Sequence, residues 1–188
     1  MKKSKGIITL VIFIMIIFVI IFSWKKYYGF TFEKVVVEEP SIFIQCKRTL
    51  REVLEAGCYD YLDNDLVNQK FISKEEQCGK HYICKPYYFD QVMEADQVEA
   101  KMKLDGYRPA TIMALLSFGE KNPDLQRNFP IFALGSKTTV NGFVRSPYLG
   151  FFATSEYRTI GLGPILKFHP RVRFLGVKEV TQEVARRQ

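Results

Sequence analysis

The chain has 188 residues, of which 47% are hydrophobic and 25% are charged, a balance that is typical of folded globular proteins and excludes an intrinsically disordered chain. Its length suits one ordinary domain preceded by a short N-terminal segment. The formal net charge is +7, and the excess lies in the second half. Residues 107–188 carry twelve basic and five acidic side chains, whereas residues 25–106 carry twelve basic and fifteen acidic ones.

Residues 7–24 are eighteen consecutive positions without a charge, a proline or a glycine. As a helix this run is about 27 Å long, which just spans a hydrocarbon core of about 30 Å. Trp24, Tyr27 and Tyr28, with two lysines between them, form a collar suited to the lipid headgroups. The alternative is a cleaved signal peptide, but residues 22–26 offer no small-residue cleavage site. We therefore predict a single-pass anchor in the lipid bilayer.

The lysines before the apolar run favour an N-terminus inside the cytoplasm, which places the following domain on the outer side of the cytoplasmic membrane. The predicted organisation is a cytoplasmic N-terminus (1–6), an anchor (7–24), a stalk (25–40), one globular domain (41–178) and a tail (179–188).

The four cysteines, Cys46, Cys58, Cys78 and Cys84, lie within 39 residues of one another and beyond the apolar run. An even, clustered set in an exported segment indicates two disulfides. Among the three possible connectivities, pairing Cys46 with Cys58 and Cys78 with Cys84 closes the shortest loops. Two alternatives remain open: four buried thiols, or a zinc site built on Cys78, His81 and Cys84.

About three helices are expected in the domain. Thr49 and Glu52 form a capping box that predicts a helix over 50–56, with Gly57 as the residue that ends it. The Asp- and Asn-rich residues 59–68 are interpreted as a polar turn. Apolar residues at helical spacing predict a helix over 91–104, and a more buried one follows over 110–118 with Gly119 at its end.

The last third is expected to be β-structure. Asn141-Gly142 between two β-branched and aromatic runs predicts a hairpin of residues 138–140 and 143–145. Further strands are predicted over 129–134, 157–162 and 172–177. Because helices come first and an antiparallel meander follows, the expected fold class is α+β.

The sequence contains no nucleophile motif and no glycine-rich phosphate loop, so neither an enzymatic activity nor a cofactor is expected. The basic residues of the last third suggest a cationic ligand-binding patch on the predicted meander, with Tyr148, Tyr157 and Phe168 available for stacking. The patch would consist of Arg145, Arg158, Arg171 and Arg173. The alternative is a solvated face with scattered charges.

One block of the chain is recognisable. The segments GYRPAT, LLSFG, FPIFALGS and RFLGV between residues 106 and 177 resemble a recurring block in uncharacterised membrane-anchored proteins of genome-reduced bacteria. The resemblance covers about the last 80 residues and implies no activity. The layout is also distantly similar to that of C-type-lectin-like domains, an analogy of fold that does not establish a function.

These observations favour a membrane-anchored, extracytoplasmic binding or structural module. Its partner would be an anionic envelope polymer or another protein, and nucleic acid is not expected outside a cell. Two alternatives stay open: an enzyme that acts on cell-envelope material, and an accessory subunit of a membrane complex.

Overall fold

The computed structural model describes residues 40–45, 47–73 and 78–180. They belong to one compact unit that starts at Glu39, and no helix in this part of the chain is long and apolar enough to cross a membrane. The predicted anchor over 7–24 and most of the predicted stalk and tail lie outside the described residues.

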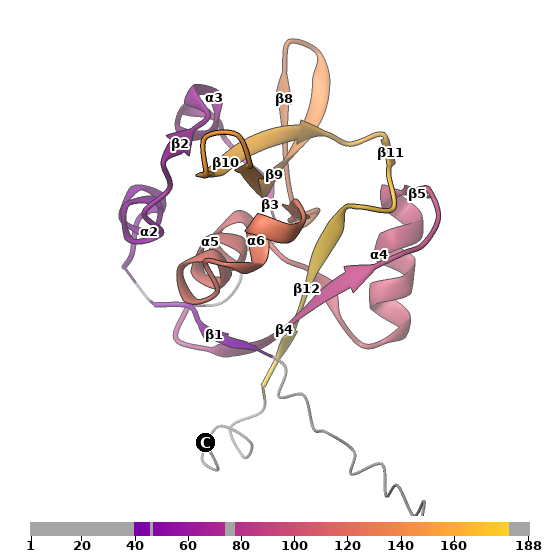
Figure 1. Ribbon diagram of the computed structural model, residues 1–188. Coiled ribbons are helices and arrows are strands. Elements are labelled where there is room, and N and C mark those ends of the chain that lie inside the picture. Colours follow the sequence, from indigo (N-terminus) through magenta and orange to yellow (C-terminus); the bar gives the residue numbers. More distant parts are fainter. Residues whose placement is uncertain (1–39, 46, 74–77, 181–188) are drawn as a thin grey trace, which may run out of the picture. The chain divides into compact units, whose positions relative to one another are not determined.

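Within these ranges, ten strands form one mixed sheet, whose main path runs β1-β4-β12-β7-β9-β10-β2 (Figure 1). Most neighbours are antiparallel, but β12 with β7 and β10 with β2 are parallel. The strands are β1 (Ser41–Phe43), β2 (Tyr61–Leu62), β3 (Ile72–Ser73), β4 (His81–Tyr88), β5 (Met93–Glu94), β6 (Arg108–Pro109), β7 (Ile131–Phe132), β8 (Ser136–Val140), β9 (Phe143–Phe152), β10 (Tyr157–Pro164), β11 (Lys167–Phe168) and β12 (Arg173–Glu179), of which β5 and β11 pair separately.

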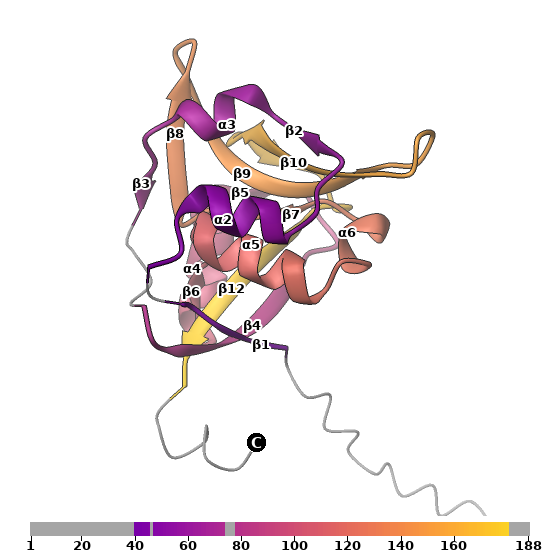
Figure 2. The ribbon, with the colours of Figure 1, turned by 90° about the vertical axis from the view of Figure 1, so that its left-hand side faces the viewer.

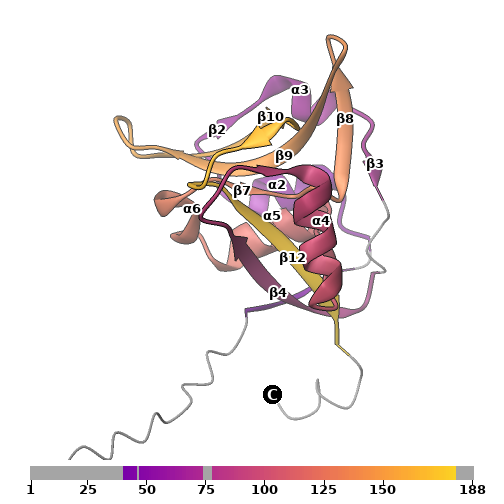
Figure 3. The same ribbon diagram turned by 90° about the vertical axis from the view of Figure 1, so that its right-hand side faces the viewer.

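Helices cover both faces of the sheet. α2 (Leu50–Ala56), α5 (Ile112–Lys121) and α6 (Leu125–Asn128) lie on one face (Figure 2), whereas α4 (Ala95–Leu104) lies on the other (Figure 3). The short helix α3 (Asn64–Asn68) follows β2. Because successive strand residues point to opposite faces, β12 contributes Leu175 to the core beneath α5 and Phe174 to the core beneath α4.

The predicted α+β class is wrong in its main feature, the separation of helices from a C-terminal meander. β4, from the first half of the chain, pairs with β12 over seven residues in the middle of the sheet. β12 lies between β4 and β7 instead of beside β10. Hydrophobic alternation identifies a strand but not its neighbour, so the sequence did not reveal this long-range pairing.

Local signals were more reliable. The capping box of Thr49 and Glu52 and the helix Leu50–Ala56 are confirmed, as is the hairpin, in which Asn141 and Gly142 both have positive φ. The helix predicted over 91–104 begins at Ala95, because residues 93–94 form β5. The predicted polar turn over 59–68 is wrong, since these residues form β2 and α3.

The two glycines predicted to end helices differ in their roles. Gly57 is the C-cap of α2, as predicted, but it keeps a right-handed conformation, and Cys58 takes the positive φ that follows the helix. Gly119 lies inside α5, where an added Cβ would collide with the Tyr59 hydroxyl and come within 2.7 Å of Leu149 Cδ1.

Replacing Gly119 with alanine tests this packing. Helix propensity alone predicts a gain in stability of up to about 1 kcal/mol, whereas the collision predicts a loss of about 1–3 kcal/mol. Chemical denaturation followed by circular dichroism measures the free energy of unfolding. Ser117→Ala in the same helix is the control, and a Gly119→Ala variant as stable as this control would contradict the packing.

Candidate ligand-binding surface

Four aromatic side chains lie at the β9–β10 end of the sheet, on the face that α4 covers elsewhere. We call Tyr61, Tyr148, Phe152 and Tyr157 the aromatic strip. Tyr157 lies directly across from Phe152 on the neighbouring strand, and the rings of Tyr61 and Phe152 meet edge to face at 6.1 Å. Three of the four are about half exposed (Tyr61 51%, Phe152 49%, Tyr157 50%). Exposed aromatic groups that are gathered in this way are typical of interaction sites.

The strip continues a row of buried rings. Beneath α4 the row includes Phe174, Phe168 and Phe132, whose neighbouring ring centroids lie 4.9 and 5.1 Å apart. Phe132 then stacks on Tyr148 at 5.1 Å with an interplanar angle of 19°. The row therefore passes from the core to solvent at Tyr148, where the coverage by α4 ends.

Glycines beneath Tyr148 let its ring lie flat on the sheet. An added Cβ would come within 2.9 Å of Tyr148 Cε2 at Gly150 and within 3.1 Å of Cε1 at Gly161. Gly161 is the cross-strand partner of Tyr148. A β-branched residue at either position would push the Tyr148 ring away from the sheet, so these glycines allow the ring to lie flat on the backbone.

Carboxylates border the strip where β2 runs along β10. Asp60 accepts a hydrogen bond from the Arg158 N–H at 2.8 Å, and Asp63 accepts one from the Leu162 N–H at 3.3 Å. They extend the two-residue pairing of β2 and hold Tyr61 in place between them. Burial, with Asp63 and Tyr61 as smaller causes, raises the pKa of Tyr148. Glu156 adds an exposed carboxylate in the turn before Tyr157.

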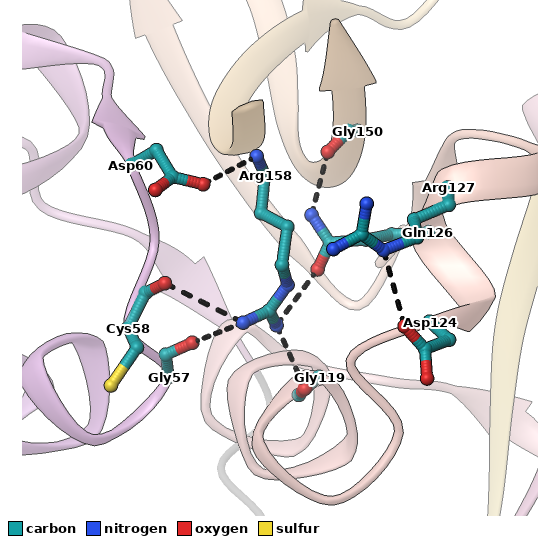
Figure 4. Close-up of polar contacts among 9 residues, drawn as sticks. All are labelled: Gly57, Cys58, Asp60, Gly119, Asp124, Gln126, Arg127, Gly150 and Arg158. Atoms are coloured by element: carbon teal, nitrogen blue, oxygen red, sulfur yellow. Dashed lines mark hydrogen bonds and ion pairs between the residues drawn. The ribbon is translucent and has the colours of Figure 1, made fainter. Parts of the chain in front are cut away.

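Arg158 joins the elements behind the strip (Figure 4). Its guanidinium is buried and donates to the carbonyl oxygens of Gly57 at 2.7 Å and Gly119 at 3.1 Å, and to Gln126 Oε1 at 3.1 Å. The Tyr59 ring lies 5.0 Å from the guanidinium carbon. One side chain therefore connects β10 with α5, α6 and the end of α2.

The four arginines predicted to bind a ligand do not gather in one patch. Arg158 is a buried structural residue, and Arg145 lies toward the other end of β10, across from Pro164. Arg173 lies between the rings of Tyr88 and Phe129, at 4.0 and 4.6 Å. Arg171 alone is exposed. Of the aromatic residues suggested for stacking, Tyr148 and Tyr157 belong to the strip, whereas Phe168 is buried.

The cysteines differ from one another in chemical state. Cys58 is an exposed thiol and Cys84 a buried one, neither in a disulfide, so neither of the two shortest-loop pairings forms. Cys78 is disulfide-bonded, and Cys46 lies outside the described residues. The alternative zinc site also fails, because His81 and Cys84 point to opposite faces of β4. The part of the chain that the structure describes holds no group of three potential metal ligands.

The two histidines lie on different elements. His81 packs against the Phe43 ring at 4.7 Å, and His169 Nδ1 accepts a hydrogen bond from the Arg171 N–H at 3.4 Å. Cys58 lines a hollow of about 520 Å³ between α2 and β2, together with Leu54, Tyr59 and Leu62. Arg51 and Glu55 complete the lining of this hollow, and no histidine contributes to it.

Comparison of the chain with protein-family models, curated proteins and solved structures gives no match. The resemblance to membrane-anchored bacterial proteins therefore remains a prediction from the sequence.

Removing the Arg158 guanidinium should destabilise the domain strongly. Arg158→Met leaves several buried carbonyl groups without a donor, and hydrogen bonds to a charged group contribute about 1.5–3 kcal/mol each. We expect a loss of at least about 3 kcal/mol in the free energy of unfolding. Arg171→Met, at an exposed position, should stay within about 0.5 kcal/mol of the unmodified protein. If both substitutions changed the free energy of unfolding equally, the hydrogen bonds of Arg158 would not be important for the stability of the domain.

The Tyr59 hydroxyl is buried and forms no hydrogen bond with the described residues. Burial is the main cause that raises the pKa of Tyr59 above its usual value near 10, while the nearby Arg158 opposes the shift. Below pH 10 the stabilising contribution of the protonated phenol is complete, and it is lost as the pH rises further, because the unfolded chain ionises first.

Tyr59→Phe should therefore be at least as stable as the unmodified protein at pH 7, since the buried hydroxyl is removed without a loss of packing. Between about pH 10 and 12 its free energy of unfolding should fall less steeply. Denaturant titrations across this range measure both effects. A marked loss of stability at pH 7 would mean that the hydroxyl has a partner.

Proposed function

We propose that this protein is a non-catalytic, glycan-binding module whose ligand lies on the aromatic strip. We further propose that the module is displayed outside the cytoplasmic membrane, anchored by the apolar residues 7–24. The observation that carries the proposal is the aromatic strip at the β9–β10 end of the sheet, in which three rings are half exposed, the Tyr148 ring lies over glycines, and carboxylates form the border.

The chemistry of the strip suits sugar rings. The C–H faces of a pyranose pack on aromatic rings, and the hydroxyl groups of the sugar hydrogen-bond to carboxylates and phenols. Three of the four rings are tyrosines, and each offers an apolar face together with a polar group. A ligand that is both ring-shaped and rich in hydroxyl groups uses both properties at once.

The charges beside the strip favour an uncharged glycan over the anionic polymer expected from the sequence. Asp60, Asp63 and Glu156 are acidic and would repel carboxylate or phosphate groups. The nearest arginine, Arg158, directs its guanidinium into the buried network behind the strip. The excess of basic residues in the second half of the sequence therefore does not make the aromatic strip a basic surface.

A glycan array probed with the full chain in mild detergent tests the proposal. We expect binding to uncharged oligosaccharides that is stronger than binding to their uronic-acid counterparts. For the best uncharged oligosaccharide, Tyr61→Ala or Phe152→Ala should each weaken the affinity about fivefold or more, the equivalent of roughly 1 kcal/mol per stacked ring.

Tyr88→Ala is the matched control, because Tyr88 is 56% exposed but lies on β4, away from the strip. Its affinity for the same oligosaccharide should be unchanged. Binding that is restricted to anionic glycans, or an equal loss in all three variants, would contradict the proposal. A complete absence of glycan binding would contradict it too and would point instead to a protein partner.

A further inference from the structure

A cluster of lysines lies at the C-terminal end of α4, where the helix meets β4 and β12. Lys85 is two residues from Tyr87 on β4, and Lys178 is four residues from Phe174 on β12, so both lysines point to the face of the sheet that α4 covers. Their ammonium groups lie 5.5 and 5.8 Å from the centroid of the Tyr107 ring. Two lysines from different strands therefore meet where the chain leaves α4.

The last turn of α4 adds Lys101 and Lys103, which are both exposed. Leu104, the final residue of the helix, is 79% exposed. The helix dipole favours lysines at the C-terminus of any helix, but Lys85 and Lys178 belong to strands, so the dipole does not explain the whole cluster. We call Lys85, Lys101, Lys103 and Lys178 the lysine surface.

The carboxylates next to the lysine surface already have partners. Asp105 pairs with Lys85 Nζ at 2.9 Å, and Glu179 pairs with Lys80 Nζ at 2.5 Å. The other three lysines of the surface form no ion pair within the part of the chain that the structure describes. The surface therefore keeps an excess of positive charge that can act on another molecule.

The chain enters the domain beside the lysine surface. The carbonyl of Pro40, the first described residue, accepts a hydrogen bond from the Cys84 N–H at 2.7 Å, and Cys84 directly precedes Lys85. Figure 3 shows the end of α4 and the end of β12 at the same end of the domain as β1. Fifteen residues, 25–39, separate Pro40 from the apolar run 7–24, and such a segment spans at most about 50 Å. A bilayer that holds the apolar run is therefore within reach of the lysine surface.

We propose that the lysine surface docks on a membrane by binding the anionic headgroups of phospholipids. This proposal rests on the proposed function, because it requires the anchor over residues 7–24. Lysines around an exposed leucine are typical of surfaces that contact a bilayer, and each lysine near an anionic membrane strengthens binding about fivefold. The anchor keeps the surface close to the headgroups, so a weak contact is sufficient. Docking leaves the aromatic strip accessible, because the strip lies near the opposite edge of the sheet from β1 and β4.

Lysine acylation of the full chain in lipid nanodiscs, read out by mass spectrometry, tests this proposal. One set of discs contains phosphatidylcholine alone, and the other an equal mixture of phosphatidylcholine and phosphatidylglycerol. We expect the acylation rates of Lys101, Lys103 and Lys178 to be at least about threefold lower in the anionic discs, because the headgroups cover these amines. High salt should remove the difference. Lys167, exposed at the other end of α4 across from Glu94, should react equally in both discs.

Charge reversal separates docking from general attraction. Lys101→Glu combined with Lys103→Glu should abolish the protection of Lys178 in anionic discs, and Lys178→Glu should abolish that of Lys101 and Lys103. The control combines Lys70→Glu with Lys167→Glu, which changes the net charge as much as the first variant, at exposed positions outside the lysine surface. This control should keep the protection.

Equal acylation rates in neutral and anionic discs, for a chain that co-elutes with both, would overturn the docking and leave the anchor in place. Protection that persists in both charge-reversal variants would overturn it as well. A chain that co-elutes with neither kind of disc would contradict the anchor and the docking together. Glycan binding at the strip is measured separately, on the array.

Discussion

The buried guanidinium of Arg158 is the interaction on which the β9–β10 end of the molecule depends. It binds the backbone carbonyls of Gly57 and Gly119 and the side chain of Gln126, and so fixes the end of α2, α5 and α6 against β10. Burying a cation is costly unless its hydrogen bonds are satisfied. These three partners serve both terminal nitrogens of the guanidinium, whereas its Nε–H has no partner among the described residues. The Arg158 contacts therefore fix the position of the chain after α2, and this in turn places Tyr61 beside β10.

The basic residues of the second half of the chain do not lie on the proposed glycan-binding strip. Two arginines of the basic second half are used within the fold: Arg158 in the buried network and Arg173 between two rings. The acidic residues of the first half reach the same region through β2, whose flanking carboxylates accept the N–H groups of Arg158 and Leu162. The exposed end of the sheet is therefore aromatic and acidic, although the second half of the chain is strongly basic.

The sequence predicted those features that depend on neighbouring residues. The capping box at Thr49 and the Asn141-Gly142 hairpin are local, and both were correct. Sequence-based prediction fails where distant packing decides. Gly119 is predicted to end a helix, but it lies inside α5, where the Tyr59 ring, distant in the sequence, leaves no room for a Cβ. Arg158 is predicted to lie on a surface patch, since arginines are rarely buried, but its guanidinium is buried. The sequence predicts Tyr148 and Tyr157 as stacking residues, but Tyr61 joins them only through the parallel pairing of β2 with β10, which the sequence does not reveal.

The most direct test of the central claim observes the aromatic rings themselves. In a sample with ¹³C-labelled tyrosine and phenylalanine rings, titration with the best uncharged oligosaccharide should shift the ring resonances of Tyr61, Phe152 and Tyr157. The resonances of Tyr88 and Phe143, exposed elsewhere on the domain, should stay in place. Shifts confined to Tyr88 or Phe143, or saturable binding without any change at the strip, would contradict the assignment of this surface as the glycan site.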